Sequence, residues 1–455
     1  GNVEPNLMFI LDDSGSMAFE DMPNPDVTSI CRRTSTGGCA DGLRITDQAY
    51  TGNTVYYNPF TSYRPWQNAN GSLMTGGTTM DAVYGSFNFA GAGYGEESDT
   101  IDLRSGSSCE NYDRNSSSTT VCGGVQVFHV PKDPGNTTDA YLRNALNYYR
   151  YEIHYVAGAP YIVRSELVNG GGPGVPAGAP VTITSIQGNR NDGNTQDFYY
   201  TLGTGQSINA ATFGGSGTVR LRLYNPSGTV VCDQGGGGTV KACSATNVAA
   251  GSWRVRLSGN NYDNVTLRVD YTEQSTIGCG TSSGWSWGNC SLTQPVAARS
   301  LAAELQNYAT WFSYHRTRMK IAKAGASEAF NQLGDNVRVG YRTIWNRNNY
   351  DIPVQDGNDG KFEDTARDTW FARLFGARGR SGTPLRAALY DTGEYFTDNS
   401  SSGPYGPADT DDQLECRQNF AILTTDGFWN GSIGTRSIGD QDGVAGAAIE
   451  NPADG

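Results

Sequence analysis

The stretch "FILDDSGSM" (residues 9–17) joins an apolar run to a dense group of carboxylates and hydroxyls. The apolar part is typical of a buried strand, and that strand has to end where Asp12 and Asp13 begin. The oxygens that follow suit two different roles, because Asp and Ser side chains cap helices and also bind hard cations. The choice between these roles depends on which other residues the chain brings to the same place.

Composition narrows the function classes before any further motif is considered. The 455 residues suggest about three domains, and 25 Tyr, 16 Phe and 8 Trp supply enough buriable surface for folded cores. A formal net charge of −13 argues against nucleic-acid binding, which needs a cationic surface. No apolar run approaches the roughly 20 residues of a membrane-spanning helix. We therefore expect neither a nucleic-acid partner nor a membrane span.

Eight of the nine cysteines fall into close pairs that bracket polar, Gly/Ser-rich loops. None of the pairs has the CxxC spacing of a zinc site, so local disulfides and an oxidising compartment are the interpretation that we favour. The ninth, Cys416, is either buried and free or paired outside this chain. The predicted disulfides are Cys31–Cys39, Cys109–Cys122, Cys232–Cys243 and Cys279–Cys290.

Apolar strands and amphipathic helices alternate at the two ends of the chain, which is typical of an α/β fold with a parallel sheet. The strands are expected at 6–11, 337–344 and 419–427, and the helices at 296–330 (one long helix), 364–376 and 383–396. Almost everything from 18 to 290 would then be inserted into one α/β domain. We expect this domain to be incomplete at its C-terminal end, either because the chain is a fragment or because its final part is missing.

The middle of the chain changes to a period of two, for example in "TVRLRLYN" (218–225) and "SWRVRLSG" (252–259). Short alternating strands separated by turns predict an antiparallel β-sandwich. The sandwich segment is similar to the bacterial pre-peptidase C-terminal type. The expected domains are 1–17 with 291–455 (α/β), 18–180 (an insertion with disulfides, aromatic loops and a Gly/Pro linker), 181–275 (the sandwich) and 276–290 (a disulfide loop).

Polar side chains follow the first and last predicted strands and begin one predicted helix. Asp12, Ser14 and Ser16 lie after the first strand, Thr383 follows the Gly-rich loop "RSGTPL", and Asp426 follows the last strand. Because ligands of parallel sheets bind beyond the carboxyl ends of the strands, we expect these oxygens to meet at one edge. They suit a divalent cation, Mg²⁺ first, with Mn²⁺ or Ca²⁺ as alternatives. Helix capping alone is the competing interpretation.

This set resembles the metal-ion-dependent adhesion site of von Willebrand factor A domains, whose pattern DxSxS is present in "DDSGS" (residues 12–16). The resemblance implies that Ser14, Ser16 and Thr383 bind the ion directly and that Asp12 and Asp426 act largely through water. It also implies an open position for a carboxylate of a partner. The expected fold class is therefore α/β: a Rossmann-like von Willebrand A domain, interrupted by an insertion that contains an antiparallel β-sandwich.

Four segments together resemble the PilC/PilY family of type IV pilus tip-associated adhesins: "EPNLMFILDDSGSM" (4–17), "VYYNPFTSYRPW" (55–66), "ELQNYATWFSYHRTRM" (304–319) and "CRQNFAILTTDGFWNG" (416–431). The resemblance implies export through the periplasm, residence at the pilus tip or outer cell surface of a bacterium, and roles in pilus assembly, attachment and twitching motility. The implied partners are minor pilins and a protein or glycan receptor.

The common enzyme signatures HExxH, GxSxG and the P-loop are absent, so we do not expect an enzyme. The alternative is a secreted module associated with an enzyme or protease, because sandwiches of this type accompany secreted peptidases. Outward arginines on the sandwich fit either anionic glycans or a solvated sheet face. The aromatic cluster at 53–66 fits either sugar binding or packing of the insertion against the α/β domain.

Overall fold

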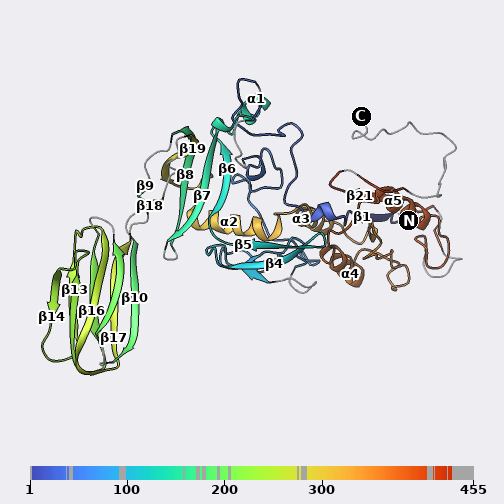
Figure 1. Ribbon diagram of the computed structural model, residues 1–455. Helices are drawn as coiled ribbons and strands as arrows, with labels where there is room; N and C mark the ends of the chain where they lie inside the picture. Colours follow the sequence, from blue (N-terminus) through green and yellow to red (C-terminus); the bar gives the residue numbers. More distant parts are fainter. Residues whose placement is uncertain are drawn as a thin grey trace. The chain divides into compact units, whose positions relative to one another are not determined.

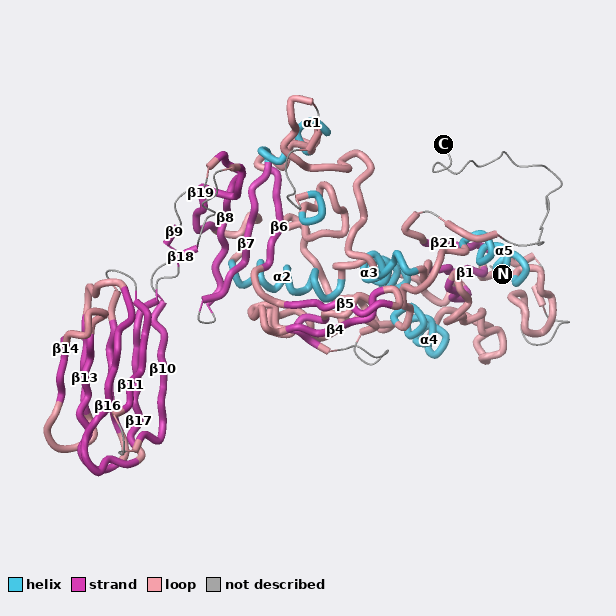
Figure 2. The backbone as a smooth tube through the Cα atoms, viewed as in Figure 1, coloured by secondary structure: helices cyan, strands magenta, loops and turns pink. Residues whose placement is uncertain are grey.

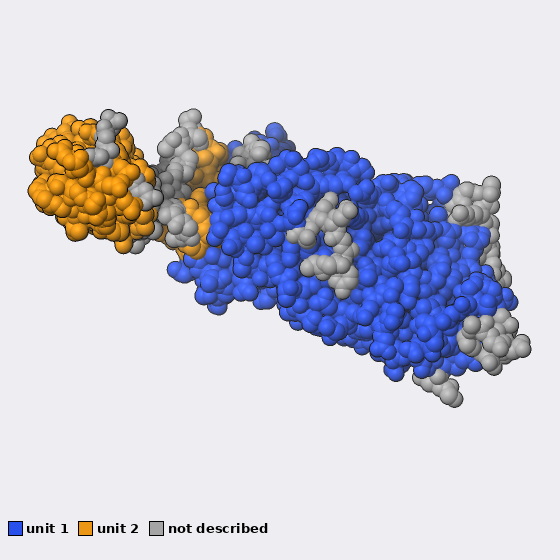
Figure 3. All heavy atoms as spheres, turned by 90° about the horizontal axis from the view of Figure 1, so that it is seen from below, with its two compact units in different colours: residues 1–148, 294–455 blue, residues 149–293 orange. Residues whose placement is uncertain are grey.

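The computed structural model describes residues 3–36, 38–39, 45–91, 99–156, 159–170, 175–176, 181–191, 195–202, 206–273, 276–277, 284–406, 413–414, 416–427 and 429–432. The chain divides into two compact units, shown in separate colours in Figure 3. One unit contains residues 1–148 and 294–455, and the other contains residues 149–293. The first unit therefore holds both ends of the chain together with the first part of the expected insertion.

Strand β1 (Asn6–Leu11) carries the opening apolar run and is the middle strand of a parallel sheet with the order β20-β1-β21. Its neighbours are β20 (Arg338–Thr343) and β21 (Asn419–Thr424), which run parallel to it over their full lengths. Figures 1 and 2 show β1 and β21 side by side, although more than 400 residues separate them in the sequence. The carboxyl ends of all three strands consequently lie at one edge of this sheet.

The alternation of side chains along β1 builds a core on each face of the sheet. Phe9 and Leu11 pack into the core that contains residues of α3 (Arg318–Asn331) and α4 (Asp364–Phe375). Met8 and Ile10 pack on the other face with residues of α5 (Leu385–Tyr395). Each fully buried side chain of this size contributes about 1.5–3 kcal/mol, so β1 is fixed from both sides.

The expected fold class is wrong. The parallel sheet has three strands within the described part of the chain, which is too few for the Rossmann-like von Willebrand A core that we expected. Strands hold 37% of the residues and helices 17%, and most strands belong to antiparallel sheets. The cause is the insertion, because segments such as "CENYDR" (109–114) and "SSTTVC" (117–122) form strands from polar alternating residues that give little apolar signal.

Several short elements complete the described part of the first unit. Strand β2 (Val83–Tyr84) pairs with β3 (Thr100–Ile101), and β4 (Cys109–Arg114) pairs with β5 (Ser117–Cys122). The remaining elements are the 3-10 turns η1 (Gly15–Ala18), η2 (Thr46–Gln48) and η3 (Ala145–Asn147), strand β6 (Gln126–Pro131) and helix α1 (Asp139–Leu142).

The second unit consists of antiparallel strands. Strand β8 (Ala159–Asn169) pairs with both β7 (Tyr148–Val156) and β19 (Trp285–Thr293), and β9 (Val175–Pro176) pairs with β18 (Thr276–Ile277). Two four-stranded sheets, β10-β17-β12-β15 and β11-β16-β13-β14, share one apolar core. Their strands are β10 (Val181–Arg190), β11 (Gln196–Leu202), β12 (Ile208–Phe213), β13 (Ser216–Tyr224), β14 (Val230–Gln234), β15 (Lys241–Ala245), β16 (Gly251–Asp263) and β17 (Val265–Glu273).

Residues 296–330 form two helices, which corrects the expectation of one. Helix α2 (Leu301–Tyr314) ends before His315, and α3 begins after Thr317, whose hydroxyl accepts a hydrogen bond from Lys320 N at 3.1 Å. The apolar stripe continues across this break, so periodicity alone did not reveal it. At 14 residues each, α2 and α3 are too short to cross a membrane, and no other helix of the described ranges is long and apolar enough.

Part of the aromatic cluster at 53–66 packs inside the first unit, where Tyr57 and Trp66 are buried, while Phe60 is exposed. Trp66 is 1% exposed and donates from Nε1 to the carbonyl oxygen of Tyr314 at 2.8 Å. Nearby, the buried ammonium group of Lys323 donates to the carbonyl oxygens of Phe89 (2.9 Å) and Phe375 (2.8 Å). Burial holds the pKa of Lys323 well below its usual value. These contacts join the segments before and after the second unit, which favours packing over sugar binding for this cluster.

The predicted disulfides Cys31–Cys39, Cys109–Cys122 and Cys232–Cys243 are confirmed. Cys290 is also disulfide-bonded, while its predicted partner, Cys279, lies outside the described residues. Cys416 is free, as one alternative expected, but it is exposed, so the expectation that the thiol is buried is wrong. In the chain-entropy model, each short loop closed by a disulfide gains roughly 3 kcal/mol.

Candidate functional site

Asp12 lies directly beyond β1 and is completely buried. Its Oδ1 accepts a hydrogen bond from Ser14 N at 2.8 Å, and its Oδ2 accepts one from the hydroxyl of Thr425 at 2.7 Å. Burial raises the pKa of Asp12, while the hydrogen bonds from Ser14 and Thr425 oppose that rise and the charge of nearby Asp426 adds to it. A buried carboxylate near a second carboxylate is a site at which a cation would relieve both desolvation and repulsion.

The hydroxyls of Ser14 and Ser16 lie 3.1 Å apart, at the start of the η1 turn. Ser14 is completely buried and Ser16 is partly exposed. Two neutral oxygens thus stand next to the buried carboxylate of Asp12, with one side open to solvent. Hydroxyl oxygens are hard donors of the kind that Mg²⁺ and Ca²⁺ accept.

A second loop, residues 379–383, is bonded to the first. Gly15 N donates to the carbonyl oxygen of Ser381 at 2.8 Å, and Arg380 N donates to that of Asp13 at 2.9 Å. A Cβ atom at Gly379 would lie 2.8 Å from the carbonyl oxygen of Ser14, so this close approach requires glycine. The same loop carries Thr383, which is 7% exposed.

A third loop follows β21 and meets both of the others. Asp12 N donates to the carbonyl oxygen of Thr424 at 2.9 Å, and Thr383 N donates to Asn430 Oδ1 at 2.7 Å. Asp426, between these two contacts in sequence, has a side chain that is 5% exposed. The structure therefore brings together the three loops that carry Asp12, Ser14, Ser16, Thr383 and Asp426.

Arg318 was not predicted at this site. Its Nη1 lies 2.5 Å from Asp426 Oδ2, its Nη2 lies 3.4 Å from Asp21 Oδ2, and its Nε donates to the carbonyl oxygen of Asp21. The break between α2 and α3 places Arg318 at the first position of α3, next to these carboxylates. The only sequence signal would have been Thr317, which fits an N-cap in the middle of the expected long helix.

Asp13 points away from the site, unlike its neighbour Asp12. Its Oδ2 lies 2.8 Å from Arg347 Nε, and its Oδ1 accepts a hydrogen bond from Trp345 N at 3.2 Å. Burial raises the pKa of Asp13, and the contact with Arg347 opposes that rise. The two adjacent aspartates thus have different surroundings and different partners.

The chain contains a second DxSxS sequence, "DNSSS" (398–402). Comparison of the two motifs shows which contacts belong to the turn alone and which belong to the site. Ser400 N donates to Asp398 Oδ1 at 2.8 Å and the hydroxyls of Ser400 and Ser402 lie 3.0 Å apart, so the local contacts match those of residues 12–16. Ser400 and Ser402 are exposed. The motif alone is therefore a turn, and the meeting of three loops is what distinguishes Asp12.

The donor set at Asp12 suits a hard cation with few anionic ligands. The three loops that meet there carry two carboxylates and three hydroxyls, whereas no group of three or more His, Cys, Asp or Glu side chains suitable for a metal occurs among the described residues. Oxygen donors of this kind favour Mg²⁺, Mn²⁺ or Ca²⁺ over the softer transition metals. The residues therefore fit a divalent cation, provided that Asp426 is shared with Arg318.

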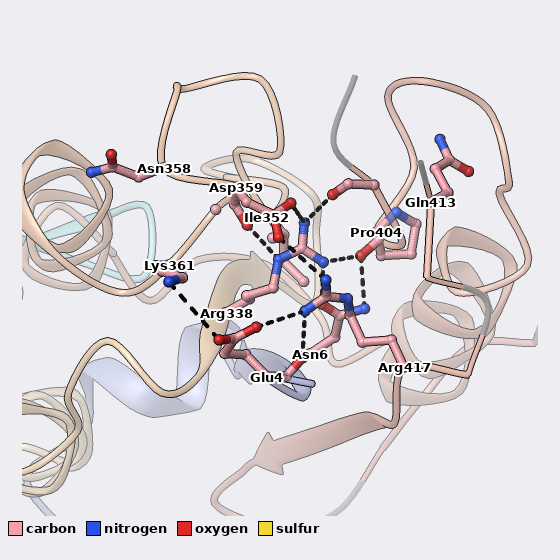
Figure 4. Close-up of polar contacts among 12 residues, drawn as sticks. Glu4, Asn6, Arg338, Ile352, Asn358, Asp359, Lys361, Pro404, Gln413 and Arg417 are labelled. Carbon is pink, nitrogen blue, oxygen red and sulfur yellow. Dashed lines mark hydrogen bonds and ion pairs between the residues drawn. The ribbon is translucent and has the colours of Figure 1, made fainter. Parts of the chain in front are cut away.

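A second charged cluster lies at the opposite edge of the parallel sheet (Figure 4). The carboxylate of Asp359 is held between two buried arginines, with Arg338 Nη2 at 3.0 Å and Arg417 Nη2 at 3.2 Å. Arg338 also donates to Asn6 Oδ1 at 2.9 Å, and Arg417 donates to the carbonyl oxygen of Glu4 at 2.6 Å. These contacts fix the amino ends of the strands, so we interpret the cluster as structural.

The outward arginines of the sandwich are paired with carboxylates. Arg220 and Arg222 contact Asp233, while Arg254 and Arg256 contact Asp197. Arg268 contacts Asp270 in the same manner. Their charges are largely compensated within the sheet, which favours the solvated face over a site for anionic glycans.

Three curated relatives named "Type IV pilus biogenesis factor PilY1" match this chain, all from Pseudomonas aeruginosa. The protein of strain PAK is 28% identical over 212 residues, which are 40% of this chain and 18% of the relative. That of strain PAO1 is 30% identical over 153 residues, 31% of this chain and 13% of the relative. The resemblance to the PilC/PilY family is thus confirmed, and the chain spans less than a fifth of the length of these relatives.

Other comparisons add little. No family model matches the chain. Among solved structures, the periplasmic lysozyme inhibitor PliG of Aeromonas hydrophila is 12% identical and covers 22% of this chain and 96% of its own, with a TM-score of 0.17. The propeptide form of the Bacillus licheniformis lipase BlEst2 covers 21% of this chain and 23% of its own at 18% identity, with a TM-score of 0.16. Likenesses this weak carry no argument about fold or function.

Proposed function

We propose that this chain, a relative of PilY1-type pilus biogenesis factors, is the adhesive part of such a factor and acts through a divalent cation held by Asp12, Ser14, Ser16, Thr383 and Asp426. In this proposal it is not an enzyme, and it works outside the cell, at the pilus tip or outer surface. The disulfides support an oxidising compartment, and the relatives support a place in pilus biogenesis.

The observation that carries this proposal is the bonding of three distant loops around one buried carboxylate. Backbone hydrogen bonds join residue 12 to 424 and residue 15 to 381. Burial of Asp12 close to Asp426 costs free energy that turn formation does not require. The motif at 398–402 makes the same turn with exposed serines and without this burial.

Each residue has a definite role in holding the ion. Asp12 and Asp426 supply negative charge, and the three hydroxyls supply neutral oxygens. When bound, the ion would offer an open position to an acidic side chain of a partner. Ser16 lies on the partly exposed side of the set and is the residue past which that side chain would approach.

The proposed partners are minor pilins and a protein or glycan receptor. Acidic partners need the cation most, because the chain itself carries a net charge of −13 and repels them without it. A divalent ion at the contact turns a locally repulsive surface into an attractive one. Binding should therefore depend on the ion.

The test measures binding of the purified chain to immobilised minor pilins and to a panel of matrix proteins and glycans, in Mg²⁺ and in EDTA. Asp12→Asn tests the site, and Asp398→Asn is the matched control in the second DxSxS turn. We expect at least one ligand that binds wild type and Asp398→Asn in Mg²⁺ only and that Asp12→Asn does not bind. Equal binding in Mg²⁺ and EDTA would overturn the cation-dependent adhesin.

A further inference from the structure

A β-hairpin of the inserted region reaches the candidate cation site. Strands β4 and β5 pair from Cys109–Cys122 at the disulfide-bonded base to Arg114–Ser117 at the tip. The two turn residues, Asn115 and Ser116, have φ values of 49° and 69°. A two-residue turn with positive φ at both positions matches the twist of the strands and favours Asn at its first position. The tip therefore has a defined conformation, and it presents Asn115.

Successive residues of this tip contact different segments around the site. Asp113 Oδ2 lies 2.6 Å from Arg380 Nη2, in the loop that leads to Thr383. The guanidinium carbon of Arg114 lies 4.6 Å from the centre of the Phe19 ring, in the segment that follows η1. These two contacts hold the hairpin against both loops, so the position of Asn115 is fixed from either side.

Asn115 lies against the glycine of the motif itself. Its Oδ1 accepts a hydrogen bond from Ser381 N at 3.1 Å. A Cβ atom at Gly15 would lie 2.1 Å from the same oxygen, so the carboxamide rests directly on the backbone between Ser14 and Ser16. Gly15 N in turn donates to the carbonyl oxygen of Ser381. Gly15, Ser381 and Asn115 thus form a closed contact between the two hydroxyl-bearing loops.

We propose that Asn115 is a positioning residue of the cation site, which sets the spacing between the Ser14/Ser16 loop and the Thr383 loop. This inference rests on the cation site of the proposed function. Asn115 is well suited to the role because its carboxamide oxygen accepts the hydrogen bond from Ser381 N and so ties the hairpin tip to the Thr383 loop. It also explains why glycine stands between the two serines, since any side chain there would displace the carboxamide.

The test uses the full chain and calorimetric titration with Mn²⁺ and Mg²⁺. We expect Asn115→Ala to weaken cation binding by about 10–100-fold, the usual effect of removing a group that orients ligands. Asn111→Ala is the matched control, because Asn111 lies on the same hairpin and accepts a hydrogen bond from Thr120 at 2.6 Å within it. Asn115→Asp keeps the acceptor oxygen and should retain the affinity of wild type or exceed it.

A double-mutant cycle separates positioning from general stability. Gly15→Ala should weaken cation binding in wild type, and much less in the Asn115→Ala background, because the overlapping carboxamide is then gone. Thermal melts without metal should show that Asn111→Ala and Asn115→Ala are both folded at the temperature of the titration. Additive effects in the cycle, or unchanged affinity in Asn115→Ala, would overturn the positioning role while leaving the cation site standing. Absence of binding to wild type would instead overturn the proposed function.

Discussion

The guanidinium group of Arg318 lies 2.5 Å from the carboxylate of Asp426. An aspartate that binds a metal ion would be expected to have no such positively charged partner. The contact joins the start of α3 to the loop after β21, across 108 residues of sequence. Arg318 also contacts Asp21, so its guanidinium group is shared between two carboxylates. The charge of Asp426 is thus partly balanced before any metal ion binds.

Arg318→Gln should therefore strengthen cation binding. Removal of a positive charge in contact with Asp426 leaves that carboxylate free for the ion, and a gain of about tenfold corresponds to about 1.4 kcal/mol. Titration calorimetry measures it. Arg64→Gln is the control with the same change in net charge, because Arg64 forms an exposed pair with Glu328. Unchanged or weaker binding by Arg318→Gln, in a protein that melts normally, would show that Arg318 does not compete with the ion.

Asp13→Asn should lower stability without changing cation affinity. The carboxylate is 2% exposed and holds Arg347 and Trp345 N, so its loss leaves buried groups without their charged partner. We expect the free energy of unfolding to fall by about 1–3 kcal/mol. Denaturant unfolding and cation titration of one preparation check both parts. A loss of affinity as large as that of Asp12→Asn would mean that both aspartates serve the ion.

His315 should make the stability dependent on pH in a mildly acidic window. Burial lowers the pKa of His315 to about 4, against about 6.5 in the unfolded chain. The native state therefore binds fewer protons than the unfolded state between these values, so stability is full above pH 6.5 and falls toward pH 4. His315→Gln should remove this part of the slope, which reaches at most about 1.4 kcal/mol per pH unit. Parallel slopes in wild type and variant would contradict it.

Asp359→Asn should destabilise the fold from the opposite edge of the sheet. Arg338 is completely buried, and the neutral amide would leave it and Arg417 without their shared carboxylate. We expect a loss of about 3 kcal/mol, typical of breaking a buried ion pair. Asp351→Asn, which breaks the pair between the exposed carboxylate of Asp351 and Arg342, should cost less than about 1 kcal/mol. Equal losses in the two variants would show that the cluster in Figure 4 is not a structural clamp.

The sequence predicted the parts of the site that local pattern encodes. The apolar run 9–11 ends at Asp12, so a strand and a polar loop follow from residue order alone, and the close cysteine pairs predicted their own bonds. Arg318 and Asn115 could not be predicted in this way. Their site contacts, with Asp426 and Ser381, span 108 and 266 residues, and neither residue type marks a cation site.

The prediction of the fold class was wrong for a related reason. Apolar strands and helices at the two ends of the chain gave a strong α/β signal, but they make up the smaller part of the molecule. Most residues of the hairpin of β4 and β5 are polar, and Tyr112 and Val121 are the only buried ones in the two strands. The hairpin therefore depends strongly on strand pairing, a two-residue turn and a disulfide. Strands of this kind are clear in the structure, but the sequence carries only a weak signal for them.

The most direct test of the account is a calorimetric titration of Mg²⁺ and Mn²⁺ into wild type, Asp12→Asn and Asp398→Asn. We predict one site with a dissociation constant below the millimolar range in wild type and in Asp398→Asn, and an affinity reduced at least about 10–100-fold in Asp12→Asn. Thermal melts without metal should show that all three proteins are folded. If folded wild type binds neither ion at millimolar concentration, or if Asp12→Asn and Asp398→Asn bind equally, the loops around Asp12 do not form a cation site.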